Sequence, residues 1–187
     1  MSELEETIHE SIEQAAGSRI NARVAVMVAI TATFMALCNV KDRNIVVAMS
    51  QAQAHSIDAW SYFQAKSTKQ AIAENALELL RSQKGPDSLI TKYEASIKRY
   101  EKEKAEVKKQ AEGYAKEYDD INVFHDQFDM TDALLTIAIA MFGIASLTQK
   151  KWLFYFASCV SILGIIIGIA AFLKISLHSD LISSILG

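Results

Sequence analysis

The chain alternates between long charged stretches and three runs that carry no charged side chain. The uncharged runs cover residues 24–40, 133–149 and 152–173, with lengths of 17, 17 and 22 residues. A membrane-spanning helix needs about 20 mostly apolar residues, within a range of about 17 to 25. The pattern therefore predicts transmembrane helices over residues 21–40, 130–149 and 152–174. Buried core helices of a soluble protein are the alternative, but three such runs in 187 residues favour a membrane.

The first run does not have the features of a cleaved secretory signal. Its leader, residues 1–20, is acidic, with glutamates at positions 3, 5, 6, 10 and 13 in place of a basic region. No small-residue cleavage site follows the run, so we expect it to be retained as an anchor. The leader has apolar residues at helical spacing, as in a short amphipathic helix. We expect the tail, residues 175–187, to lie at the membrane interface.

Residues 41–129, between the first two spans, have the pattern of two helices that fold back on each other. Beyond position 90, apolar residues recur at alternating spacings of three and four, which is the heptad pattern of a coiled-coil seam. A matching seam precedes the turn, and the pairing predicts contacts between positions whose numbers sum to about 170. Gly85 and Pro86 indicate a turn within residues 83–88, with Gly85 left-handed. This register sets Lys66 opposite Lys104, a conflict that solvent or a neighbouring glutamate must relieve.

The predicted fold is an all-α membrane protein with three transmembrane helices. A long antiparallel helical hairpin, coiled-coil-like in its pattern, is inserted between the first and second of them. The chain is both 51% hydrophobic and 22% charged, because the apolar residues gather in the three uncharged runs and the charged residues lie outside them. Lys150 and Lys151 lie in the shortest loop, where the positive-inside bias is read. The orientation predicted from them has the N-terminus inside and the hairpin outside the cytoplasm.

Several residues indicate surfaces that need a partner. Ile57, Trp60 and Tyr62 lie off the seam of the first arm, so we expect them in an interface between copies of the chain. A Trp60 half-covered by its own hairpin is the alternative. In the third span, Gly164 and Gly168 belong to a stripe of small residues that lets helices pack closely in lipid, either within the chain or between chains.

No motif for catalysis or cofactor binding is present: the sequence has no Gly-rich phosphate loop, Gly-x-Ser-x-Gly, CxxC or HExxH. We therefore expect no enzyme activity and no cofactor. His125, Asp129 and Asp132, at the start of the second span, are a weak candidate for a divalent metal site. Acidic residues are also common at the first turn of a helix without any metal, and this reading is favoured. The charge runs mix both signs, which argues against a nucleic-acid partner.

The stretch from residue 51 to 69 reads QAQAHSIDAWSYFQAKSTK. It resembles the signature of a family of bacterial membrane proteins, domain-of-unknown-function family 4337, in which a similar Asp, Trp, aromatic pair and Gln-Ala-Lys-Ser string follows a first span. The corresponding positions here are Asp58, Trp60, the pair Tyr62 and Phe63, and residues 64–67. The resemblance implies a bacterial inner-membrane protein and no particular reaction. The leader departs from the His-rich leaders of some members, which argues against a metal site at that end.

These observations favour a non-enzymatic, homo-oligomeric membrane protein whose hairpins assemble into a scaffold or cage. Its partners would be membrane lipid and further copies of itself. A channel or transport component, with Asp129 and Asp132 near the mouth of a pore made by the oligomer, is the alternative function.

Overall fold

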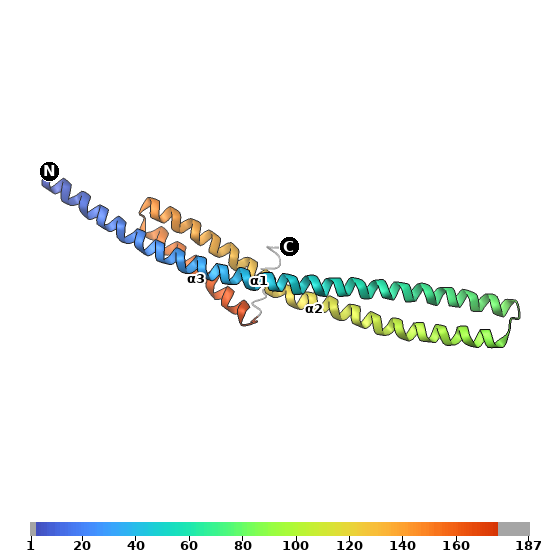
Figure 1. Cartoon of the computed structure of the whole chain (residues 1–187). Coiled ribbons are helices and arrows are strands. Elements are labelled where there is room, and N and C mark those ends of the chain that lie inside the picture. Colours follow the sequence, from blue (N-terminus) through green and yellow to red (C-terminus); the bar gives the residue numbers. More distant parts are fainter. Residues whose placement is uncertain (1–2, 176–187) are drawn as a thin grey trace. The chain divides into compact units, whose positions relative to one another are not determined.

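The computed structural model of the chain describes the backbone of residues 3–175 and the side chains of residues 19–175. Over these residues the chain is all-α, as predicted, and forms three helices (Figure 1): α1 (Glu3–Ser82), α2 (Asp87–Thr148) and α3 (Lys151–Phe172). From Glu3 onward the acidic leader belongs to α1, and its side chains up to position 18 lie outside the described residues. The predicted interfacial tail, beyond Ile175, also lies outside them.

Each of the three helices contains a segment that is long and apolar enough to cross a membrane. Only 17%, 28% and 39% of the positions in the most apolar segments of α1, α2 and α3 are buried within the chain. A soluble core helix would hide most of its apolar positions, whereas these segments leave most of theirs uncovered.

The chain divides into two compact units, and each helix segment packs within its own unit. The hairpin unit is residues 47–121, and the three-helix unit combines Met1–Val46 with Asn122–Gly187. The hairpin unit contains the second half of α1 and the first half of α2, which run antiparallel on either side of a short turn (Figure 1). The three-helix unit contains the remainder of both helices together with α3.

The two arms of the hairpin unit are held by a seam of buried apolar residues, half of them alanine. The buried positions are Met49, Ala52, Ala73 and Leu77 on α1 and Val107 and Ala111 on α2. All six belong to the heptad pattern read from the sequence. The Ser56 hydroxyl donates to the Ala111 carbonyl oxygen at 3.3 Å, and the ring of His55 lies 5.2 Å from that of Tyr114. The residue numbers of these two pairs sum to 167 and 169, close to the sum of about 170 that the sequence predicted for facing positions.

The conflict between Lys66 and Lys104 is relieved by polar neighbours on the facing arm. Lys66 Nζ donates to Glu103 Oε2 at 2.5 Å, and Lys104 Nζ donates to Gln70 Oε1 at 3.1 Å. The hydrogen bond to Glu103 raises the pKa of Lys66, and the same bond lowers the pKa of Glu103. Each ammonium therefore has its own acceptor, and the two lysines can occupy one layer of the seam.

The turn between α1 and α2 corrects one prediction: Gly85 is not left-handed. Lys84 has the positive φ of 52° instead. The amide of Gly85 donates to the Leu80 carbonyl at 2.8 Å, and the amide of Lys84 donates to the Arg81 carbonyl at 3.3 Å. This is the Schellman pattern with Lys84 as the left-handed residue. Gly85 is needed for space, since a Cβ there would lie 2.8 Å from Leu80 Cδ2 and 3.3 Å from Leu80 O.

The three-helix unit has two apolar clusters along its length. The first contains Ile20 and Val24 of α1, Ala138 and Phe142 of α2, and Ala157 of α3. The second contains Cys38, Phe128 and Ala171, again one residue from each helix. Because every cluster draws on α1, α2 and α3, the three segments pack together as one bundle.

Candidate functional site

In the three-helix unit, three ionisable side chains converge from two helices. Asp42 lies on α1, and His125 and Asp129 lie one turn apart on α2. His125 Nδ1 is 2.7 Å from Asp42 Oδ1, and His125 Nε2 is 3.7 Å from Asp129 Oδ2. One possible ligand atom from each residue lies within 4.8 Å of the other two. The imidazole ring is thus held between two carboxylates.

Burial and charge act in opposite directions on the pKa of His125. Partial burial lowers this pKa, but the hydrogen bond to Asp42 and the charges of the surrounding aspartates outweigh burial, so the net pKa is raised. Partial burial also raises the pKa of Asp129, and the opposing attraction of His125 does not cancel the rise. Both shifts reflect a partly desolvated site with an excess of negative charge.

The structure brings together two of the three residues that the sequence offered as a weak metal candidate. Asp132 is not among the converging ligand atoms, and Asp42 takes its place. The pairing register of the hairpin could have predicted that Asp42 lies opposite His125. The two residue numbers sum to 167, which is also the sum for the Ser56–Ala111 contact in the hairpin unit. Extending the register of the hairpin below position 45 would have found it.

Asp132 lies less than one turn beyond Asp129 on α2 and has a different environment. Its Oδ1 atom is buried and has no hydrogen-bond partner among the described residues. A buried polar atom without a partner costs free energy, on the order of 1–3 kcal/mol. This carboxylate therefore adds negative charge close to the His125 site without a compensating group of its own.

Other buried polar groups of the three-helix unit join its helices. The hydroxyl groups of Thr31 on α1 and Ser161 on α3 are hydrogen-bonded at 2.8 Å, and both residues are fully buried. Buried Gln127 donates through Nε2 to the carbonyl oxygen of Ile175 at 3.3 Å. The first of these bonds joins α1 to α3, and the second joins α2 to the segment that follows α3. Such contacts help to fix how the helices pack.

The predicted interface residues of the hairpin unit lie on its surface. Ile57 is 58% exposed, Trp60 37% and Tyr62 52%. The Trp60 ring packs edge-on against Phe63 of the same arm at 5.5 Å, so its own hairpin covers part of it. Trp60 and Tyr62 are two residues apart on a helix and therefore point to different sides of the arm.

Gly164 and Gly168 were predicted to lie in an interface between copies, and the structure corrects this prediction. Gly164 and Gly168 are buried inside the chain. A Cβ on Gly164 would lie 2.9 Å from Leu135 Cδ2, and one on Gly168 would lie 2.8 Å from Phe34 Cε1. These glycines let α3 approach α2 and α1 within one chain, so they are not free to form an interface between copies.

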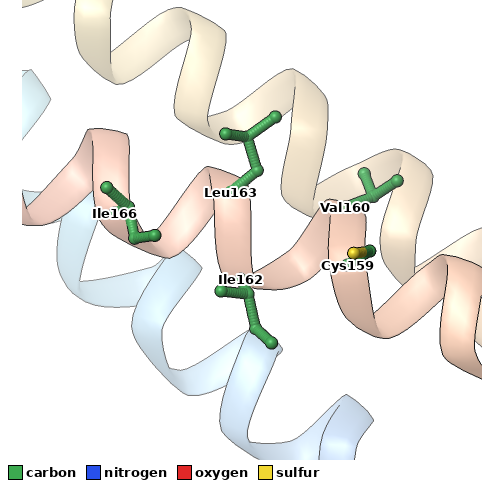
Figure 2. Close-up of a pocket in the computed structure, with 5 residues that line it drawn as sticks. All are labelled: Cys159, Val160, Ile162, Leu163 and Ile166. Carbon is green, nitrogen blue, oxygen red and sulfur yellow. The ribbon is translucent and has the colours of Figure 1, made fainter.

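The surface of α3 carries an apolar hollow of about 340 Å³ (Figure 2). Its lining consists of Cys159, Val160, Ile162, Leu163 and Ile166, all from this one helix. In Figure 2 these side chains present carbon and a single sulfur, with no nitrogen or oxygen. The hollow therefore offers apolar contact and a single thiol, that of Cys159.

Comparison with known proteins places the chain by its sequence. Searches of curated proteins and of solved structures gave no match. A family model does match, and the matched residues, 20–174, contain both α3 and the whole hairpin unit. They also contain the resemblance at residues 51–69 and the three ionisable side chains around His125. The chain therefore belongs to the family described as Domain of unknown function (DUF4337).

Proposed function

We propose that the chain is a non-enzymatic, homo-oligomeric protein of the bacterial inner membrane. In this proposal α3 and the apolar segments of α1 and α2 cross the membrane, and the hairpin unit forms a coiled-coil-like scaffold on one side. The observation that carries the proposal is the apolar surface left exposed on all three helices of the three-helix unit. Large exposed side chains include Val26, Ile30 and Leu37 of α1, Ile137 and Ile144 of α2, and Trp152, Phe156 and Ile166 of α3. Such a surface is unfavourable in water and suits hydrocarbon.

The interior of the same unit supports a lipid environment. Continuous helices satisfy their own backbone hydrogen bonds, which a bilayer core requires. The fully buried Thr31–Ser161 pair places hydroxyl groups between the helices and away from the apolar surface. Polar side chains inside and apolar side chains outside are the distribution expected of a small membrane bundle.

Assembly of several copies is supported by the surface of the hairpin unit. A two-helix rod can bury one stripe of each arm, and Ile57 and Trp60 lie outside that stripe. Tyr62 is exposed on another side of the arm. Aromatic residues on two sides favour head-to-tail contacts, in which each copy touches two neighbours. Such contacts form a ring when the rotation from copy to copy closes on itself.

Replacing Trp60 with alanine is expected to shift the solubilised complex to smaller species. Aromatic residues at the centre of an interface commonly cost about 2 kcal/mol or more when truncated, which is roughly a 30-fold loss in affinity. The size of the full-length protein in a mild detergent, measured by chromatography with light scattering, reports the change. Helix content should stay at the wild-type level, because Trp60 is not part of the seam.

Ile72→Ala is the matched control, since Ile72 is an exposed apolar residue of the same arm, 62% accessible. This variant should keep the wild-type size. A Trp60→Ala complex of wild-type size would contradict the proposed interface, and so would equal dissociation in both variants.

The proposed orientation has the hairpin in the periplasm and the N-terminus in the cytoplasm. We expect a Gln83→Cys variant without Cys38 and Cys159 to react with a membrane-impermeant thiol reagent in intact cells. Position 83 is exposed at the tip of the hairpin, whereas Thr148 is exposed at the C-terminal end of α2, beside the connection to α3. A Thr148→Cys variant, which keeps Lys150 and Lys151, is the matched control and should react only after lysis. Labelling of the control in intact cells, with position 83 labelled only after lysis, would contradict this orientation.

A further inference from the structure

The cluster of Asp42, His125 and Asp129 has a composition suited to one class of ligand. Its possible donors are an imidazole nitrogen and two carboxylate oxygens. This mixture suits first-row transition metals such as Zn²⁺, whereas Mg²⁺ and Ca²⁺ prefer oxygen alone. We propose that His125 and Asp129 bind a divalent transition-metal ion and that Asp42 positions the imidazole.

The distances around the imidazole assign these roles. Asp42 Oδ1, 2.7 Å from His125 Nδ1, can accept the proton on that nitrogen. The lone pair is then on Nε2, which faces Asp129 Oδ2 at 3.7 Å. Zinc lies about 2.0–2.2 Å from nitrogen and oxygen ligands, so one ion can contact both atoms after a small adjustment. A carboxylate on the far nitrogen is the usual partner of a metal-bound histidine.

The charges around the cluster provide a second reason for a bound cation. Asp42 and Asp129 form ion pairs with His125 and with no lysine or arginine among the described side chains. Asp126 and Asp132 add to the negative field that acts on Asp129. The buried Oδ1 atom of Asp132 has no hydrogen-bond donor among the described residues. Among the described side chains, protonated His125 is the one positive charge paired with any of these four carboxylates, and it pairs with Asp42 and Asp129. A divalent ion would supply further positive charge at this place.

The site would also connect two helices. His125 and Asp129 belong to α2, whereas Asp42 belongs to α1, 83 positions away from His125 in the sequence. A metal ion held by α2 and fixed through Asp42 would link the two helices near the end of the three-helix unit. All three side chains belong to one chain, so the site requires neither a second copy nor a particular membrane orientation.

Titration of the metal-stripped full chain in mild detergent with Zn²⁺ tests the proposal. Calorimetry should show saturable binding of Zn²⁺ and none of Mg²⁺ under the same conditions. His125→Ala should abolish binding. Asp42→Asn should weaken it by about 10- to 100-fold, the usual effect of losing a carboxylate behind a metal-bound histidine. Co²⁺ in place of Zn²⁺ should give visible absorption bands that disappear in His125→Ala.

Asp120→Asn removes the same charge from an exposed position of α2 outside the cluster and should bind Zn²⁺ like the wild type. Circular dichroism checks that each variant keeps its helix content. Should His125→Ala lose helix content, His125→Gln, which retains a donor for Asp42, replaces it. Absence of saturable Zn²⁺ binding, or equal binding in the wild type and the histidine variant, would overturn the site. If Asp42→Asn and Asp120→Asn weakened Zn²⁺ binding equally, diffuse surface charge and not a defined site would attract the ion.

Discussion

Gly168→Leu is expected to destabilise the three-helix unit by about 3 kcal/mol or more, the upper part of the usual range for overpacking. Even a Cβ at this position would lie 2.8 Å from Phe34 Cε1 and 3.0 Å from Thr131 Cγ2. The Phe34 ring packs against Phe172 and the second apolar cluster, so it has little room to retreat. A leucine would therefore force α3 away from α1 and α2.

Thermal unfolding in detergent, followed by helix content, measures the effect as a lower midpoint. Gly143→Leu is the matched control, because a Cβ on Gly143 meets nothing within 4 Å. That variant should unfold at or above the wild-type temperature, since leucine favours helix more than glycine. Equal midpoints for the two leucine variants would contradict the close packing of α3.

Small-residue spacing in α3 predicted close packing but could not give the partner. Gly164 and Gly168 recur at the spacing of any close helix contact in lipid, within or between chains. The choice depends on which large residues lie opposite, and these are Leu135 on α2 and Phe34 on α1. That pairing arises from the antiparallel return of the chain, which no local pattern of α3 contains.

The register of the hairpin was predictable because it is a long-range consequence of a local repeat. All the buried seam residues of the hairpin unit occur in the heptad pattern, and the Lys66 conflict was visible in the same pairing. The residue that adopts the left-handed conformation in the turn could not be predicted in this way. The helix ends one position earlier than the glycine suggested, so Lys84 takes the positive φ and Gly85 provides space.

The sequence analysis found only those residues of the candidate metal site that lie on one helix. His125 and Asp129 were found because they lie one turn apart on one helix. Asp42 was missed because it lies 83 positions away, although the sum of paired positions would have led to it. Residues that meet across a hairpin become visible in a sequence only when the register is carried to the end of both arms.

The proposed function depends most on the claim that the three apolar helix segments lie in a lipid bilayer. Fewer than two-fifths of the positions in these segments are buried within the chain. Removing apolar surface from water is worth roughly 25 cal/mol per Å², so a single chain would lose much stability in leaving hydrocarbon. Washing with alkaline carbonate opens vesicles into sheets and removes proteins held by surface charge, but it does not extract helices embedded in lipid.

The most direct measurement is therefore the distribution of the full chain after an alkaline carbonate wash of cell membranes. We expect the protein to stay with the membrane sheets and to enter solution only when a mild detergent dissolves the lipid. Extraction by detergent is the internal control, because aggregated protein would stay in the pellet under both treatments. Release into the carbonate supernatant would contradict a membrane-spanning bundle, and so would a pellet that resists detergent.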